Sequence, residues 1–173
     1  KLSARQVDGQ GELVASILRN VRIEGMLQKR GTVITSSPLR LKSDKIDGEL
    51  LAMFDMKSGR YDLALLGDIR GLLIPGLGIV DLHTRAKAVP DRAGAFSLTG
   101  RVQADMRRLD NGFFRTLGGG LPRLQSGIAL GSDGRLMLSN LSLRSPLMHF
   151  DGSGVRNPDG TINIRGTGTH RQY

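Results

Sequence analysis

The feature that most constrains the fold is an alternation of apolar and polar residues that recurs along most of the chain. It is clearest over residues 78–89, where small and aliphatic residues take turns with charged ones. The apolar positions there are Val80, Leu82, Thr84, Ala86 and Ala88, and the polar positions are Asp81, His83, Arg85 and Lys87. A period of two residues is typical of a β-strand with one apolar face.

The same period is found before and after this segment. It covers residues 21–28, 37–44, 60–70 and 96–106, and continues as the pairs Ile128 and Leu130, Leu136 and Leu138, Met148 and Phe150, and Ile162 and Ile164. Between Leu138 and Leu141 the alternation slips by one residue, which predicts a β-bulge around Ser139 and Asn140. We therefore expect eight to ten strands.

Asp-Gly pairs supply the turns. Such a pair provides the positive φ angles that tight hairpins require, so it predicts antiparallel neighbours. Those at 47–48 and 151–152 lie inside alternating runs and are candidates for bulges instead. The five pairs are Asp8-Gly9, Asp47-Gly48, Asp133-Gly134, Asp151-Gly152 and Asp159-Gly160.

Two segments depart from the two-residue period. Residues 12–19 carry apolar side chains at one-turn spacing, which predicts a short amphipathic helix. Residues 110–118 predict a second helix, with Asp110 as the N-cap, Phe113, Phe114 and Leu117 as the apolar side, and Gly118 as the end. No linker is long enough to divide the chain, so we expect one domain over residues 1–173.

The charge calls for an anionic partner or surface. The chain has a formal net charge of +9, for which nucleic acid and anionic lipid are the obvious candidates, while a merely soluble basic surface is the alternative. No run of about 18 apolar residues exists, so we expect no membrane span within this segment. Strands that bind single-stranded nucleic acid usually present aromatic platforms. Aromatic residues are only 4% of this chain, so no nucleic-acid partner is expected, and a basic nucleic-acid-binding β domain remains a third alternative.

Signatures of catalysis are missing from the sequence. The three histidines, His83, His149 and His170, do not have the spacing of metal ligands. The G-x-G triplets lack a third glycine and a following lysine, and no G-x-S-x-G motif is present. The absence of cysteine excludes thiolate chemistry. We therefore predict a protein that is not an enzyme, with no catalytic residues, no metal site and no cofactor.

The apolar side of the expected strands must either pack against another part of the protein or bind an apolar ligand. A sandwich or closed barrel would bury that side against itself. The alternative is a curved sheet that forms an open trough. A lining of Leu, Ile, Val and Met with few aromatic residues suits flexible acyl chains, which need apolar contact area more than directional bonds.

The C-terminal sequence decides between these alternatives. The segments "DGRLMLSNLSLRSPLMHFDGSG" and "NPDGTINIRGTGTHRQY" resemble the C-terminal repeats of the AsmA-like superfamily of bacterial envelope bridge proteins, particularly the TamB and YdbH branches. The resemblance is strongest over residues 127–173 and weaker back to about residue 11. It implies a periplasmic β-sheet groove, anchored in the inner membrane by an N-terminal helix, that conducts phospholipids to the outer membrane. TamB-like members are also linked to outer-membrane protein assembly.

These inferences define the expected protein. It is all-β and mainly antiparallel, a curved sheet that forms an open groove with one or two short helices, excised from a longer periplasmic protein. We expect it to bind phospholipid acyl chains and to contribute to phospholipid transport between the two membranes. The runner-up is a module that assembles outer-membrane proteins by β-augmentation, offering its open strand edge to client strands. The expected lipid-binding residues are Val80, Leu82, Phe96, Leu98, Val102, Ile128, Leu130, Leu136, Leu138, Met148, Phe150, Ile162 and Ile164.

Overall fold

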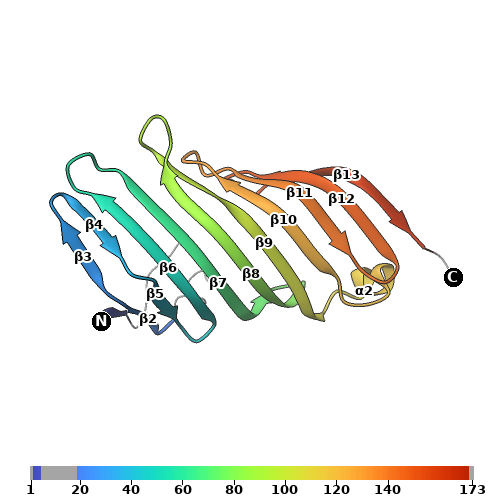
Figure 1. Ribbon diagram of the computed structural model, residues 1–173. Coiled ribbons are helices and arrows are strands. Elements are labelled where there is room, and N and C mark those ends of the chain that lie inside the picture. Colours follow the sequence, from blue (N-terminus) through green and yellow to red (C-terminus); the bar gives the residue numbers. More distant parts are fainter. Residues whose placement is uncertain (1, 5–18, 172–173) are drawn as a thin grey trace.

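The computed structural model describes residues 2–4 and 19–171 as one curved sheet with one short helix (Figure 1). The described strands number thirteen, so the expected count of eight to ten was too low. They are β1 (Leu2–Ala4), β2 (Val21–Glu24), β3 (Leu27–Arg30), β4 (Val33–Ser36), β5 (Leu39–Lys42), β6 (Ile46–Asp55), β7 (Tyr61–Ile74), β8 (Gly78–Pro90), β9 (Phe96–Leu109), β10 (Arg123–Leu130), β11 (Leu136–Arg144), β12 (Met148–Arg156) and β13 (Ile162–His170), and the helix is α2 (Gly112–Gly118).

The strands follow one another across the sheet almost as they do along the chain. The order is β1-β2-β5-β6-β7-β8-β9-β10-β11-β12-β13, with every pairing antiparallel. The sheet does not close on itself, because β1 and β13 lie at its opposite ends. The prediction of a mainly antiparallel, curved and open all-β sheet is confirmed.

One alternating run does not form the single strand that its period predicts. Residues 21–28 divide into β2, which pairs with β5, and β3, which pairs with β4 outside the main path. The division falls at Met26, whose backbone N–H donates to the Ser37 hydroxyl oxygen at 3.0 Å and whose carbonyl accepts from the Ser37 N–H at 2.9 Å. These two bonds join the strand to the β4–β5 connection, so the β3–β4 hairpin leaves the main strand order and pairs with β6 through β4.

Two of the Asp-Gly pairs close hairpins as predicted. Asp133-Gly134 lies in the β10–β11 turn and Asp159-Gly160 in the β12–β13 turn, and both glycines have positive φ, at 77° and 88°. Asp47-Gly48 lies within β6 in unbroken register with β7, so the idea of a bulge there was wrong. The bulge predicted at residues 139–140 is confirmed by the register shift between Leu138 and Leu141. Asp8-Gly9 lies outside the described residues.

The second predicted helix is present as α2, with a different N-cap. Asn111 rather than Asp110 caps it, and its side-chain oxygen accepts the Phe114 N–H at 3.2 Å. The helix ends at Gly118 as predicted, and Gly119 follows in the left-handed conformation. The helix predicted over residues 12–19 lies outside the described residues apart from Arg19.

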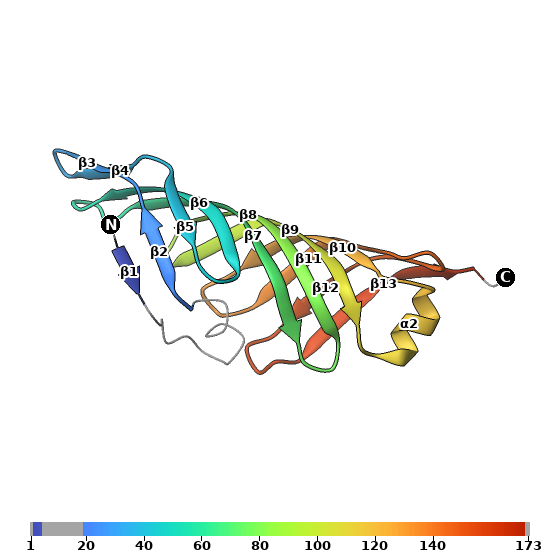
Figure 2. The same cartoon turned by 90° about the horizontal axis from the view of Figure 1, so that it is seen from below.

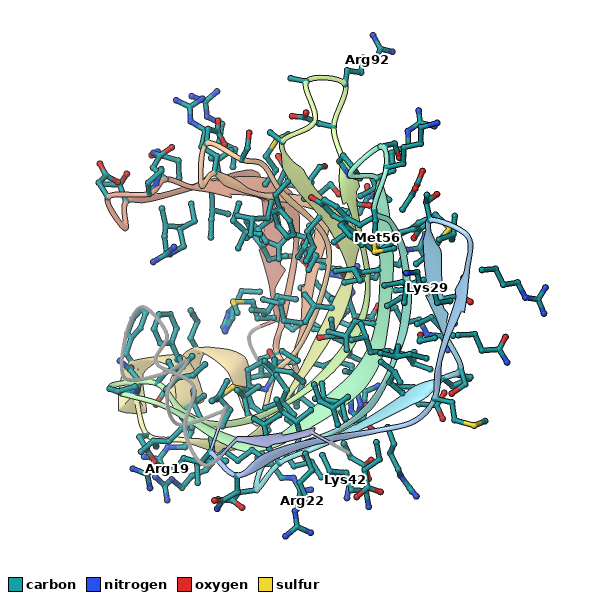
Figure 3. All side chains as sticks on the ribbon, turned by 90° about the vertical axis from the view of Figure 1, so that its left-hand side faces the viewer. Arg19, Arg22, Lys29, Lys42, Met56 and Arg92 are labelled. Carbon is teal, nitrogen blue, oxygen red and sulfur yellow. The ribbon has the colours of Figure 1, made fainter. Side chains whose placement is uncertain are left out.

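The sheet is bent along its strands, so that its cross-section is an arc (Figure 3). Glycines in the middle of the strands permit this bend. A Cβ atom at Gly100 of β9 would lie 2.7 Å from the Ala86 Cα of β8, and still closer to the Arg85 carbonyl oxygen. Gly152 and Gly166 lie opposite each other on β12 and β13, and a Cβ atom on either would also lie within 2.9 Å of the backbone of the other strand. Only a residue without a side chain fits where neighbouring backbones come this close.

The sheet has little conventional core. Among the described residues, the hydrophobic side chains that are buried number six: Val21, Leu72, Val80, Ala88, Leu109 and Leu141. The substantial contacts between described elements are those of neighbouring strands and of α2 with β9. Figure 2 likewise shows α2 beside one end of the sheet rather than spread across it. No second layer of described elements therefore covers the sheet.

Candidate functional site: an apolar concave face and a polar outer hollow

The two faces of the sheet are identified from β2 and β5. Arg22 and Lys42, which pair with each other, point away from the inside of the arc (Figure 3). Leu41, which neighbours Lys42 in the strand, therefore faces the inside, as does Gly48, its partner on β6. The pairing continues from Gly48 to Gly67 on β7 and onward across the sheet. The face that carries the apolar half of the alternation is thus the concave one.

Strand register places all thirteen predicted lipid-binding residues on this concave face. One row of partners crosses β9 to β13 at Leu98, Leu130, Leu136, Arg156 and Ile162. The next row contains Gly100, Ile128, Leu138, Gly154 and Ile164. The remaining members align through their own partners, which are Met106 for Val80, Ala104 for Leu82, Thr84 for Val102, Pro90 for Phe96, Leu143 for Phe150 and His170 for Met148.

Most of these side chains are accessible. Phe96, Ile162 and Ile164 are exposed, at 41%, 58% and 51%, and nine others are half-buried. Val80 is the exception, because it is only 1% exposed and lies against its neighbours. Val80 therefore packs beneath the neighbouring side chains of the concave face and is not accessible to a ligand. The concave face is therefore an exposed apolar surface that runs across many strands.

A few polar groups interrupt the concave face. Arg156 stands between Leu136 and Ile162 in the first row, and Thr84 flanks Val102. Ser126 is buried, and its hydroxyl donates to the Gly127 carbonyl at 2.8 Å and lies 3.2 Å from the Ser139 carbonyl. Ser126 thereby fastens the backbone of the β11 bulge and adds no free polar group to the surface.

The opposite, outer face contains a shallow hollow of about 1180 Å³. A twisted sheet is saddle-shaped. When it curves towards one face along its strands, it therefore curves towards the opposite face in the direction across its strands. The side chains of the hollow come from β5 to β11 and are mostly polar. They include Arg40, Glu49, Asp68, His83, Arg85, Arg101, Gln103 and Gln125.

Carboxylates are hydrogen-bonded to basic side chains at one side of the outer face. His83 Nδ1 lies 2.8 Å from an Asp68 oxygen, and its Nε2 lies 3.5 Å from Asp105. Asp105 also accepts hydrogen bonds from Gln103 and Arg123. Burial of Asp105 acts to raise the pKa of its carboxyl, but the bonds from Gln103 and Arg123 outweigh it and hold the pKa below its ordinary value.

Asp81 lies in the same strand as His83 but is almost inaccessible. Its carboxylate accepts the Gly71 N–H at 2.8 Å and the Arg107 Nε–H at 2.6 Å. These bonds, that of Gly71 foremost, lower the pKa of Asp81. The Gly71 bond fixes the bulge at which β7 slips register between Ile69 and Leu72. Asp81 therefore stabilises the sheet.

The structure offers neither a metal cluster nor a membrane helix within its described part. Over residues 2–4 and 19–171, no three His, Cys, Asp or Glu side chains are grouped as metal ligands. No helix in the same ranges has the length and apolar character that a bilayer crossing requires.

Comparison with known proteins found no match to this chain among protein-family models, curated proteins or solved structures. The resemblance to AsmA-like proteins therefore remains a prediction, and the two faces have to be interpreted from their own geometry.

The apolar concave surface is predictable from the sequence, whereas the outer hollow is not. Alternation alone identifies which residues share a face, and this was sufficient for the concave lining. It does not show which polar residues are opposite each other across strands. That depends on register, which the bulge between Ile79 and Val80 and the β8–β9 turn set for the central strands.

Proposed function

We propose that the chain is a non-enzymatic lipid-binding segment whose concave face holds the acyl chains of phospholipids. The observation that carries this proposal is the accessibility of the apolar face. Twelve of its thirteen predicted residues are half-buried or exposed, and no second layer of described elements covers them. An exposed apolar surface of this extent on a folded protein marks a binding surface.

The chemistry of the lining supports a hydrocarbon ligand. The face consists mostly of aliphatic side chains and glycines, with Phe96 and Phe150 among them, and its polar interruptions are few. Each methylene group that leaves water for such a surface contributes about 0.8 kcal/mol, so a long acyl chain gains affinity from contact area alone. The row that contains Gly100, Ile128, Leu138, Gly154 and Ile164 has no polar side chain, so such a chain could move along it from strand to strand. Together with the resemblance to AsmA-like proteins, this supports a role in phospholipid transport between the inner and outer membranes, with a periplasmic location.

A pair of matched positions tests the proposal. Ile164 and Met137 are apolar and similarly accessible, at 51% and 57%, but they lie on the concave and the outer face respectively. A photo-crosslinking amino acid is placed at each position in turn. The two proteins are irradiated with vesicles of phosphatidylethanolamine and phosphatidylglycerol, and lipid adducts are measured by mass spectrometry.

We expect adducts at Ile164 and few at Met137. Equal yields at the two positions would show that lipid contact does not depend on the concave face, and the proposal would be wrong. Ile164→Asp should weaken lipid binding, because it places a charge among acyl chains, whereas Met137→Asp should leave it unchanged. Both positions are more than half exposed, so neither substitution buries a charge in the folded chain.

One observation favours a second candidate function, the docking of client β-strands. All nine residues of β13 are exposed, and within the described part of the chain β13 pairs only with β12. An edge strand with free backbone groups can accept another strand by β-augmentation. Crosslinks from β13 to unfolded outer-membrane proteins, without lipid adducts at Ile164, would support this function over lipid transport.

A further inference from the structure

We infer that Arg85 and Arg101 form a phosphate-binding site on the floor of the outer hollow. They lie on neighbouring strands, β8 and β9, directly opposite each other in the register. Both line the hollow, on the face away from the apolar surface. The inference concerns a different face from the proposed lipid contacts and does not depend on them.

The arrangement is unfavourable without a ligand. Side chains directly opposite on antiparallel strands approach closely, and like charges in these positions destabilise the sheet. In the part of the chain that the structure describes, neither guanidinium group has an ion pair or a hydrogen bond. The guanidinium groups of Arg85 and Arg101 are therefore adjacent and lack a counter-charge within the described part of the chain.

The nearby acids do not supply that charge. Asp68, the closest along β7, is held by His83 at 2.8 Å. Glu49 lies on β6 opposite Leu66, which in turn is opposite Arg85, so it is two strands away. This separation is about 10 Å between backbones. The hollow thus has acidic residues on β6 and β7, with Arg40 of β5 beyond them, and a basic centre on β8 and β9.

The surroundings of the two arginines suit an anion that accepts several hydrogen bonds. Gly127 lies opposite Arg101 on β10, and the Ser139 hydroxyl oxygen lies 2.5 Å from the position that a Cβ would take on Gly127. Beyond it, Ser139 and Asn140 of the β11 bulge line the hollow, and Gln125 lies beside them. Of these, the Ser139 hydroxyl leans over Gly127 towards Arg101 and offers a neutral hydrogen-bonding group, whereas the Gln125 amide already donates to the Gln103 oxygen at 3.1 Å.

A phosphate group fits this combination best. Arginine presents its donors in a planar fork that matches phosphate oxygens, and paired arginines neutralise its charge. A volume of about 1180 Å³ leaves room for the rest of a phosphate ester. The group could come from free phosphate or from a phospholipid head group, which share this chemistry.

The test uses the variant R85Q/R101Q and a control, R92Q/R135Q. Arg92 and Arg135 lie in the β8–β9 and β10–β11 turns, outside the hollow, so the control loses the same charge. Inorganic phosphate is titrated into each protein, and amide shifts are followed by NMR. In parallel, binding to phosphatidylglycerol vesicles is measured by co-sedimentation.

We expect phosphate to shift the amides of Arg101 and Gly127 in the unmodified chain, and R85Q/R101Q to bind phosphate about tenfold more weakly or worse. Loss of vesicle binding in R85Q/R101Q, without any response to phosphate, would assign the site to a lipid head group. Equal losses in R85Q/R101Q and R92Q/R135Q, or no binding of either probe by the unmodified chain, would overturn the inference.

Thermal melting separates binding from folding. In phosphate-free buffer R85Q/R101Q should melt at the same temperature as the unmodified chain or higher, because the repulsion between the arginines is removed. Phosphate should raise the melting temperature of the unmodified chain and of R92Q/R135Q but not of R85Q/R101Q. A lower melting temperature for R85Q/R101Q in phosphate-free buffer would contradict the premise that the pair is strained.

Discussion

The bend of the sheet can be tested at Gly100. The proposed acyl-chain surface requires the strands to curve, and the structure places the backbone of β8 where a side chain at Gly100 would be. A Cβ atom there would lie 2.7 Å from the Ala86 Cα and 3.0 Å from the Ala86 Cβ. Both distances are well below van der Waals contact, and the nearest atoms belong to backbone that cannot rotate away.

The expected cost of Gly100→Ala follows from this geometry. Elsewhere in a strand, alanine is favoured over glycine by roughly 0.5–1 kcal/mol, because glycine loses more conformational freedom on folding. Here, inserting a methyl group into a filled site costs about 1–3 kcal/mol. We expect the steric cost to win and a net destabilisation of about 1–2 kcal/mol. For a chain of this length that lowers the melting temperature by about 2–8 °C.

Thermal and urea unfolding followed by circular dichroism measure the effect, with Gly112→Ala as the control. Gly112 begins α2 and has nothing within 4 Å of the position a Cβ would take. The same substitution there should be neutral or stabilising. If Gly100→Ala were as stable as the unmodified chain, the strands would not be bent against each other as described, and the explanation of the concave face would fail.

Two further substitutions test the local structure. Asp81→Asn should destabilise the sheet by about 1–3 kcal/mol at neutral pH, because the charge-assisted bond from Arg107 is weakened and the bond from Gly71 loses its charged acceptor. The folded-state pKa of Asp81 lies below its ordinary value of 3.8, so its contribution is complete above that pH and is lost as the pH falls through the folded value. Urea unfolding between pH 7 and pH 3 should therefore show a smaller acid dependence for Asp81→Asn, and an unchanged one would refute this role. Asn111→Ala removes the N-cap of α2 and should cost about 1 kcal/mol, whereas Asn111→Asp should retain stability. Hydrogen exchange of the Phe114 amide measures this directly, and faster exchange in both variants would contradict the assignment of the cap.

The fold could be predicted from the sequence because its signals are local. The alternation over residues 78–89 becomes β8, the slip after Leu138 becomes a bulge, and the Asp-Gly pairs at 133 and 159 become turns. Where a distant contact decides, the prediction was wrong. Residues 21–28 keep the period of a single strand, yet Ser37, eleven residues beyond Met26, divides them.

For the candidate site, the sequence predicts which residues share a face but not how deeply they are buried or which residues they face across strands. Whether a residue lies on the concave face follows from its odd or even position in the strand. That assignment does not change when the predicted ends of the strand are wrong by a residue or two. How deeply a residue lies in that face does not follow, since Val80 and Ile162 have similar side chains and opposite exposures. The arginine pair of the outer hollow requires the register of β8 against β9. A shift of one residue in that register would place Gly100 or Val102 opposite Arg85 and turn Arg101 to the other face.

The order of the strands has a consequence for how such a protein changes length. From β6 to β13 each strand pairs with the one that precedes it in the chain. Most partners are therefore close in sequence, which favours rapid assembly by successive zippering of hairpins. Inserting or deleting one hairpin would move the two halves of the sheet apart or together by about 10 Å and would leave every other connection as it is. The width of the sheet across its strands is therefore set by the number of hairpins and can change without altering the rest of the fold.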